Sequence, residues 1–229
     1  MFRLIRLFRT SIGSKLVAAA TGTLLLGFLL VHMAGNLVIL QGQNALNAYA
    51  AWMQGHPLLW GFRFVLLALF AVHVTTVWRL ARGNSRARPV DYRHQAGFRR
   101  YLPPRLMLFS GLLVLGFLVL HLLHLTTGWI GPDVSHLVDG EGRTDVYARI
   151  TTSFSDPLMA GAYLAAMALL GLHLLHAVES LFQTFGFNHE SYAGLIRVLA
   201  PALTLLIVAG FATVPLLVLA GIIPQGSTG

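Results

Sequence analysis

The stretch Gly171–Gly186, GLHLLHAVESLFQTFG, places two histidines inside a long apolar run. The same LHLLH pattern occurs at Leu120–His124, and His32 and His73 lie in two further apolar runs. Ionisable groups are costly in the interior of a bilayer, and those that occur there usually have a function. The pattern therefore predicts a bundle of apolar helices organised around histidines that lie within the membrane.

The composition points to an integral membrane protein. Of the 229 residues, 56% are hydrophobic and 10% are charged, whereas a soluble domain has about 25% charged residues. The apolar runs do not alternate with polar residues, which favours helices over the strands of a barrel. The absence of cysteine excludes disulfides, thiolate zinc sites and iron–sulfur clusters within the chain. No cleavable signal peptide is expected, because the first apolar run is long and no small-residue cleavage site closes it.

The apolar runs predict a single membrane domain over residues 1–229, built as a bundle of five transmembrane helices. About 20 apolar residues cross a bilayer, and five runs reach that length, at 14–40, 57–80, 103–127, 157–185 and 195–223. Residues 1–14 are interpreted as an amphipathic segment at the membrane surface or as a simple basic flank. Residues 41–56 predict a short loop with a surface helix, and residues 128–156 predict a long acidic loop. Pro201 and Pro215 are expected to bend the last helix.

The distribution of arginine predicts the orientation of the helices. Eight arginines lie between positions 79 and 105, against a single acid, and three more lie in the first nine residues. Cytoplasmic loops carry an excess of Lys and Arg, so the N-terminus and the basic segment are expected on the cytoplasmic side. Five spans then place the acidic loop and the C-terminus outside. Nucleic-acid binding is not expected, because topology already explains the basic segment.

The predicted helix directions sort the histidines by depth. His32 and His121 lie nearer the outer face, and His73 and His173 lie nearer the cytoplasm, each about 10 Å from a helix end at the usual helical rise. Two imidazoles at one level on facing helices suit a haem with two axial histidines in an apolar slot. The fold predicted from the residues is therefore an all-α membrane bundle that encloses two b haems, which would form an electron path across the membrane.

Each HxxH motif offers two histidines on one helix face. His124 and His176 lie closer to the helix ends, so His121 and His173 are the predicted axial ligands, and the outboard pair is placed for a propionate or a quinone. Two alternatives remain for these side chains. Any one of them is a hydrogen-bonded packing residue, or an HxxH pair binds zinc, for which Glu179 is the acidic residue nearest to the second motif.

Other polar residues are candidate contacts for haem, quinone or partner proteins. Arg63, near the outer end of the second helix, either pairs with a propionate of the outer haem or extends towards the membrane surface. At the cytoplasmic side, four residues either contact the propionates of the inner haem or are ordinary topological charges: Ser14, Lys15, Arg79 and Arg82. Candidate quinone contacts at the outer side are Asn44, Asn47 and His56. Three residues near the end of the fourth helix either contact a partner subunit or ligand or form a solvated helix end: Glu179, Ser180 and Gln183.

The histidine-bearing motifs resemble the five-helix, di-haem cytochrome b anchor subunit of succinate dehydrogenases and menaquinol:fumarate reductases. The resemblance covers most of the chain. It rests on FLLVHMAGN at 28–36, HPLLWGFRFVLLALFAVH at 56–73, LVLHLLH at 118–124 and LHLLHAVESLFQTFG at 172–186. It implies axial ligation of two b haems by His32 with His121 on the outer side, and by His73 with His173 on the inner side.

The resemblance also implies partners and a location. A flavoprotein subunit with covalent FAD and an iron–sulfur subunit would dock on the cytoplasmic face of a bacterial cytoplasmic membrane. Succinate or fumarate chemistry would occur in those partners, while this chain, embedded in membrane lipid, relays electrons between the iron–sulfur subunit and a quinone, with menaquinone favoured. Some quinol-oxidising members carry a glutamate two residues before the fourth helix ligand, where Gly171 stands here. A glutamate proton path is therefore not expected at this site, and succinate oxidation is the favoured direction.

Two rival interpretations were weighed. Another di-haem b subunit, such as that of a hydrogenase or formate dehydrogenase, would place its histidines at other helical positions, and one histidine set on each of the first four helices argues against it. A haem-free transporter or structural membrane protein would line a water path with the histidines or pack them against hydroxyl groups, and it would show no visible absorbance. The absence of inverted repeats gives that interpretation little support.

Overall fold

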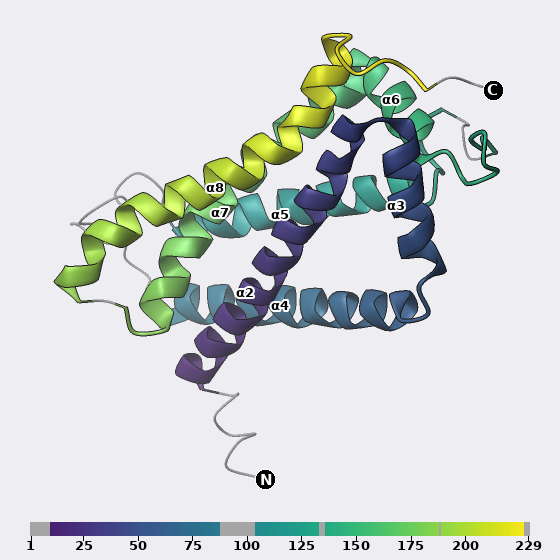
Figure 1. Cartoon of the computed structure of the whole chain (residues 1–229). Helices are drawn as coiled ribbons and strands as arrows, with labels where there is room; N and C mark the ends of the chain where they lie inside the picture. Colours follow the sequence, from purple (N-terminus) through teal and green to yellow (C-terminus); the bar gives the residue numbers. More distant parts are fainter. Residues whose placement is uncertain (1–9, 88–103, 133–135, 188, 227–229) are drawn as a thin grey trace. The chain divides into compact units, whose positions relative to one another are not determined.

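The computed structural model of the chain describes residues 10–87, 104–132, 136–187 and 189–226. Within these ranges the regular structure is helical (Figure 1), apart from one isolated bridge between Val138 and Thr144. The predicted N-terminal surface segment, at 1–9, and most of the basic segment, at 88–103, lie outside the described residues. The predicted all-α class is therefore confirmed for the part of the chain that the structure describes.

Five of the helices are long enough and apolar enough to cross a membrane. They are α2 (Ser11–Asn36), α4 (Leu59–Ala87), α5 (Pro104–His121), α7 (Pro157–Thr184) and α8 (Glu190–Leu219). The shortest apolar span, Leu106–Thr126, has 21 residues, which corresponds to about 31 Å of helix and matches a hydrocarbon core of about 30 Å. The five predicted spans are thus present, and α8 continues through both of its prolines.

Short helical elements complete the described chain. α2 leads into a 3-10 turn, η1 (Leu37–Gln41), and α3 (Gln43–Gly55) is the helix expected between the first two spans. α5 ends in a π-helical segment, η3 (Leu122–Thr126). The prediction of a loop over 128–156 is wrong in part, because the helix α6 (Val146–Ser155) forms within it. Asp145 caps α6, because its side chain accepts a hydrogen bond from the Ala148 amide at 2.9 Å.

The chain forms two compact units. Unit 1 consists of Met1–Phe28, Gly61–Leu112 and Leu172–Thr204, and unit 2 consists of Leu29–Trp60, Leu113–Gly171 and Leu205–Gly229. The helices α2, α5, α7 and α8 each contribute residues to both units. As a result, His73 and His173 belong to unit 1, whereas His32 and His121 belong to unit 2. The prediction of a single membrane domain stays a prediction.

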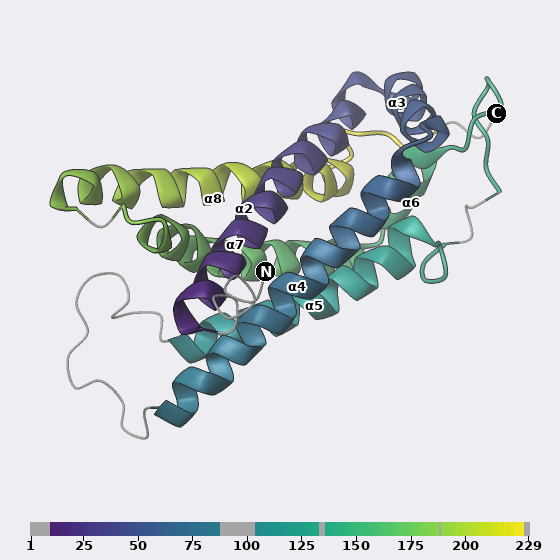
Figure 2. The same ribbon diagram turned by 90° about the horizontal axis from the view of Figure 1, so that it is seen from below.

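Unit 2 contains a packed core of apolar side chains. α3 packs against η1 and α6 (Figures 1 and 2). The core residues that these elements share with α7 and α8 are Ile39, Leu46, Tyr147, Phe154, Ala160, Tyr163, Val214, Val218 and Ile223. The sequence did not predict α6 within the loop. The helix contributes two aromatic side chains to this core, and their burial explains why a helix forms there.

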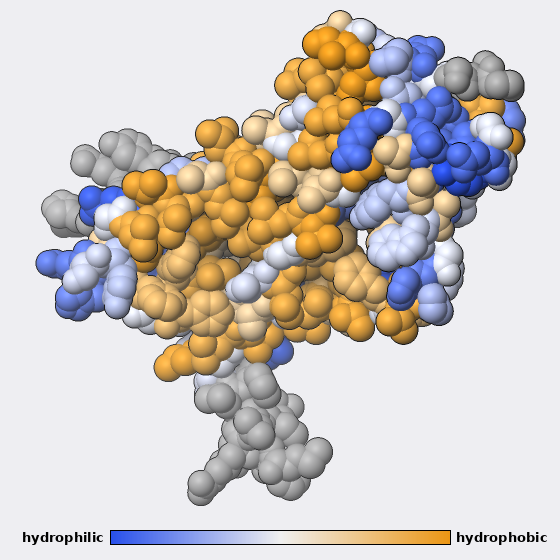
Figure 3. Space-filling view, viewed as in Figure 1, coloured by the Kyte–Doolittle hydropathy of each residue, from blue (hydrophilic) through white to orange (hydrophobic). Residues whose placement is uncertain are grey.

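The surfaces of the long helices are apolar. On α4, Phe62, Phe64 and Leu67 are each more than half exposed. In water, such a surface would be an aggregation liability, whereas lipid tails are as apolar as these side chains and solvate them. Figure 3 shows hydrophobic residues over the visible helix surfaces, while hydrophilic residues gather where Figure 1 places α3 and the segment before α6. This distribution is that of a multi-pass membrane protein.

Candidate functional site

Unit 2 brings His32 of α2 and His121 of α5 together. The centroids of the two imidazole rings lie 5.9 Å apart, with the ring planes at 79°. Both side chains are half-buried, and the Phe211 ring of α8 lies 5.7 Å from the His32 ring. Two histidines from helices far apart in sequence are therefore neighbours in a mostly apolar setting.

Tyr163 of α7 is the centre of an aromatic cluster beside this pair. Its ring centroid lies between 4.9 and 6.1 Å from those of Phe117, His121, His124 and Phe154. The sequence analysis missed Tyr163, because a single tyrosine in an apolar helix belongs to no spaced motif that would indicate a function. Its place near the start of α7 was a usable signal, since the predicted topology puts that end at the level of the second half of the preceding helix.

His124 is the more buried histidine of its HxxH motif, with 2% of its surface exposed. Its Nδ1 lies 2.9 Å from the Tyr163 hydroxyl, and its Nε2 has no hydrogen-bond partner among the described residues. The sequence placed His124 nearer the helix end, yet the backbone at Gly131 folds against the ring, so close that a Cβ there would lie 2.8 Å from His124 Cδ2. His124 also sits on η3, and π-helical turns are frequent at functional sites. Its predicted role towards a propionate or quinone stays a prediction.

Unit 1 holds the second predicted pair, His73 of α4 and His173 of α7. The two rings are close enough to interact electrostatically. His73 Nδ1 lies 3.0 Å from the Thr21 hydroxyl of α2, and His173 Nδ1 lies 3.2 Å from the Ser110 hydroxyl of α5. Both hydroxyl side chains are buried and both imidazoles are half-buried. Each histidine is thus held at the same ring nitrogen by a hydroxyl group from a neighbouring helix.

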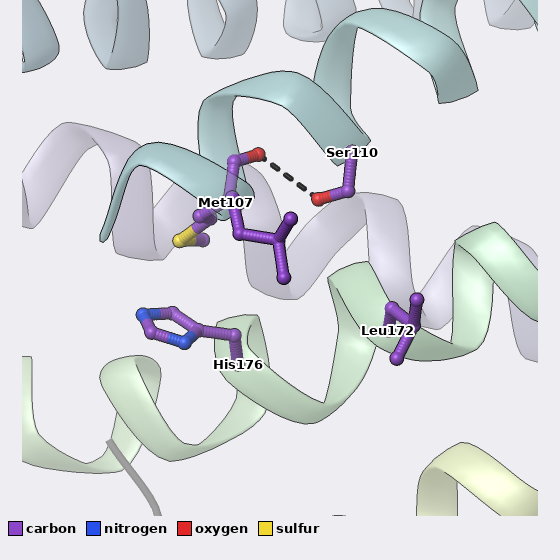
Figure 4. Close-up of a pocket in the computed structure, with 5 residues that line it drawn as sticks. Met107, Ser110, Leu172 and His176 are labelled. Carbon is purple, nitrogen blue, oxygen red and sulfur yellow. Dashed lines mark hydrogen bonds between the residues drawn. The ribbon is translucent and has the colours of Figure 1, made fainter. Parts of the chain in front are cut away.

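The two hydroxyl groups already have acceptors for their own protons. The Thr21 hydroxyl donates to the Val17 carbonyl at 2.7 Å. The Ser110 hydroxyl donates to the Met107 carbonyl at 3.0 Å, as Figure 4 shows. Hydroxyl groups of this kind commonly bond back to a carbonyl one turn earlier in a helix. Their oxygen lone pairs therefore remain for the imidazoles.

A glycine follows each of these hydroxyl residues. A Cβ at Gly22 would lie 3.3 Å from His73 Cε1, and a Cβ at Gly111 would lie 3.2 Å from His173 Cε1. Carbon atoms in contact prefer about 3.5–4.0 Å, so a larger residue at either position would push the ring away from its helix by a few tenths of an ångström. Sequence reasoning missed Thr21 and Ser110, and the available signal was a hydroxyl residue followed by glycine inside an apolar run.

His176 lines a small pocket beside this arrangement. Leu106, Met107, Ser110 and Leu172 form the rest of its lining. Figure 4 shows the His176 ring extending from α7 towards Met107 of α5. Ser110 therefore contacts His173 and also borders the pocket of His176. The predicted role of His176 towards a propionate or quinone stays a prediction.

Asn47 has a role that the sequence did not indicate. It is fully buried, and its Nδ2 donates to Asp145 Oδ1 at 2.9 Å and to Asp139 Oδ2 at 3.2 Å. Its Oδ1 accepts the Tyr147 backbone N–H at 3.0 Å. The side chain was interpreted as a candidate quinone contact, but all three of these bonds tie α3 to the segment that starts α6.

Asp139 and Arg143 close the turn in front of α6. Arg143 Nη2 and Nε lie 2.7 and 2.8 Å from Asp139 Oδ2, and Asp139 Oδ1 accepts the backbone N–H groups of Glu141 and Arg143. The hydrogen bond from the Arg143 side chain is the main reason that the pKa of Asp139 is lowered to about 2. Arg143 also donates to the Asn44 side-chain oxygen at 2.6 Å. This second candidate quinone contact therefore has a protein partner as well.

Most of the remaining predicted site residues are exposed. Arg63 is exposed on α4 and belongs to unit 1, whereas His32 and His121, which its predicted haem would join, belong to unit 2. The His56 ring stacks against Trp52 with centroids 5.9 Å apart. Among the exposed basic side chains of unit 1 are three of the residues predicted at the cytoplasmic side, Lys15, Arg79 and Arg82. Their roles towards propionates stay predictions.

The zinc alternative lacks a set of ligands in the described part of the chain. No group of three or more His, Cys, Asp or Glu residues there could hold a metal ion. Zinc sites use at least three protein ligands, whereas a bis-histidine haem iron needs two.

Comparisons of the chain with protein-family models, with curated proteins and with solved structures find no match. The resemblance to a di-haem cytochrome b therefore rests on the four motifs quoted above, and membership of that family stays a prediction.

Proposed function

We propose that this chain is the membrane-anchor cytochrome b subunit of a succinate:quinone oxidoreductase. It would relay electrons between an iron–sulfur subunit and a membrane quinone, with menaquinone favoured, through two b haems. His32 and His121 would ligate one haem, and His73 and His173 the other. A flavoprotein subunit on the cytoplasmic face would carry out the succinate chemistry.

The observation that carries this proposal is the grouping of the four histidines. Each compact unit contains two of the four, from different helices. The His32 and His121 rings are already neighbours. Two histidines from different helices in each unit are the number of axial ligands that two bis-histidine haems require.

The residues around each pair suit a flat, largely apolar macrocycle. When bound, a haem accepts and donates single electrons. The chain would supply two imidazole nitrogens, an apolar lining and close contact through glycine. In unit 1 the lining close to the histidines includes Gly22 and Gly111, and in unit 2 it includes Phe117, Tyr163 and Phe211.

Haem content tests the ligand assignment. The purified chain should show a dithionite-reduced minus air-oxidised spectrum of b haem and about two haems per chain by pyridine haemochrome, as two histidine pairs require. Alanine substitution of His32, His73, His121 or His173 should remove one haem. The matched variants His124→Ala and His176→Ala should keep both. A folded preparation without haem would overturn the proposal, and one haem per chain would mean that one pair is wrong.

Partner capture tests the second half of the proposal. Membranes should yield the chain together with a covalently flavinylated protein and an iron–sulfur protein. Succinate added to that complex should reduce its b haems, and a quinone should reoxidise them. Two bound haems that respond to hydrogen or formate, and not to succinate, would instead identify another di-haem oxidoreductase.

A further inference from the structure

We infer that Thr21 and Ser110 are positioning residues that fix the ring tautomer of His73 and His173, so that each histidine presents an unprotonated Nε2 to an iron atom. This inference rests on the proposed haem function. It assigns the role to two hydroxyl groups that lie on helices other than those of the histidines they contact.

The first step concerns the direction of the hydrogen bonds. The Thr21 hydroxyl has one proton, and the Val17 carbonyl, at 2.7 Å, accepts it. The Ser110 proton is likewise accepted by the Met107 carbonyl at 3.0 Å. A carbonyl has no proton to donate, so these bonds have only one possible direction. Each hydroxyl oxygen then faces its histidine Nδ1 as an acceptor.

The second step concerns the imidazoles. Since the hydroxyl oxygens accept, the nitrogens at 3.0 and 3.2 Å from them, Nδ1 of His73 and Nδ1 of His173, carry the proton. In a neutral imidazole only one nitrogen is protonated, which leaves Nε2 with its lone pair.

The third step concerns ring orientation. Gly22 and Gly111 allow the Cε1 edge of each ring to approach the helix that bears the hydroxyl. The ring is therefore held along its Nδ1–Cε1 edge, and Nε2 is the nitrogen that remains for an iron atom. Metal-bound histidines generally donate their second N–H to a protein acceptor, which fixes the ring and raises the basicity of the ligand. The hydroxyl–glycine pairs Thr21–Gly22 and Ser110–Gly111 meet that requirement on two helices.

The predicted consequence is a change in redox potential. A more basic imidazole stabilises ferric over ferrous iron, so the hydroxyl contact should lower the midpoint potential of the haem it serves. Loss of such a contact typically changes metal binding by about 10- to 100-fold. A tenfold change in the preference for ferric iron corresponds to about 59 mV for a one-electron couple.

The experiment is a spectroscopic redox titration of the purified complex. Thr21→Val and Ser110→Ala remove the hydroxyl groups, whereas Thr21→Ser and Ser110→Thr keep them. We expect the first two variants to raise the potential of one haem by about 59 mV or more, for a tenfold effect, and to leave the other haem unchanged. The conservative variants should restore the original value.

Thr75→Val is the matched control. Thr75 lies on α4 in unit 1, and its hydroxyl donates to the Ala71 and Val72 carbonyls of its own helix. This variant should move neither potential. If Thr21→Val releases one haem instead of shifting its potential, retention of that haem in Thr21→Ser and in Thr75→Val still supports the inference.

Two outcomes overturn the inference. One is an unchanged potential in both hydroxyl-free variants with two haems bound, and the other is equal haem loss in Thr21→Val, Thr21→Ser and Thr75→Val. Failure of the haem assignment gives a different result, because the unsubstituted complex would then contain no haem at all, and haems that respond to hydrogen or formate and not to succinate would overturn only the assignment to a succinate:quinone oxidoreductase. The two failures are therefore distinguishable.

Discussion

Substitution of Asn47 by alanine should open the contact between α3 and the start of α6. Asn47 is fully buried and makes three hydrogen bonds, two to the carboxylates of Asp145 and Asp139 and one from the Tyr147 backbone N–H. Alanine can replace none of them. The substitution tests whether this polar contact, and not apolar packing alone, holds α3 in place.

The remaining partners of each group set the size of the effect. Asp145 keeps its bonds from Gln43 at 2.6 Å and from the Ala148 amide at 2.9 Å, so losing one bond there costs about 0.5–1.5 kcal/mol, and the loss at Asp139 is similar. The Tyr147 amide has no second acceptor among the described residues. Without Asn47 it would be buried and unpaired, which costs about 1–3 kcal/mol of stability. Together the losses reach about 4 kcal/mol of local stability.

Native-state hydrogen exchange measures this local free energy directly. A loss of about 4 kcal/mol should speed the exchange of α3 amides by on the order of a thousandfold, since each 1.4 kcal/mol is about a factor of ten. Asn44→Ala is the control, because Asn44 is exposed on the same helix and its side chain accepts a hydrogen bond from Arg143. Equal exchange rates in the two variants would refute the reasoning.

Three further predictions concern other parts of the chain. Asp139 has a pKa that is lowered from its ordinary value of 3.8 to about 2. Its contribution to stability should therefore be complete above pH 3.8 and be lost as the pH falls towards 2. In acid unfolding followed by tryptophan fluorescence, Asp139→Asn should lose this pH-dependent part of the stability. Tyr163→Phe removes the hydroxyl that lies 2.9 Å from His124 Nδ1 and leaves that buried nitrogen without a partner among the described residues, so thermal unfolding should show a loss of about 1–3 kcal/mol, and an unchanged melting curve would contradict this. Gly22→Ala should reduce the occupancy of one haem, because its Cβ would lie 3.3 Å from the ring of a proposed ligand; Gly27→Ala, where a Cβ meets nothing within 4 Å, should keep both haems, and equal occupancy in the two variants would argue against the close approach.

The sequence by itself determined the five membrane spans. A run of about 20 apolar residues has to satisfy its backbone hydrogen bonds internally in lipid, so length and composition were sufficient to predict the helices in α2, α4, α5, α7 and α8. Intramembrane histidines were equally visible, because an ionisable group in an apolar run is conspicuous without any structure. Direction and depth then suggested which histidines would be neighbours.

Only the tertiary structure decided which polar groups meet. Thr21 and Ser110 contact histidines 52 and 63 residues away, and although each hydroxyl residue is followed by glycine in the sequence, that local pattern does not indicate which histidine it meets. α6 escaped prediction for the same reason, because its helical form depends on burying Tyr147 and Phe154 against other helices. Membrane insertion depends on the composition of each segment alone, whereas hydrogen-bond partners and burial depend on how the segments pack.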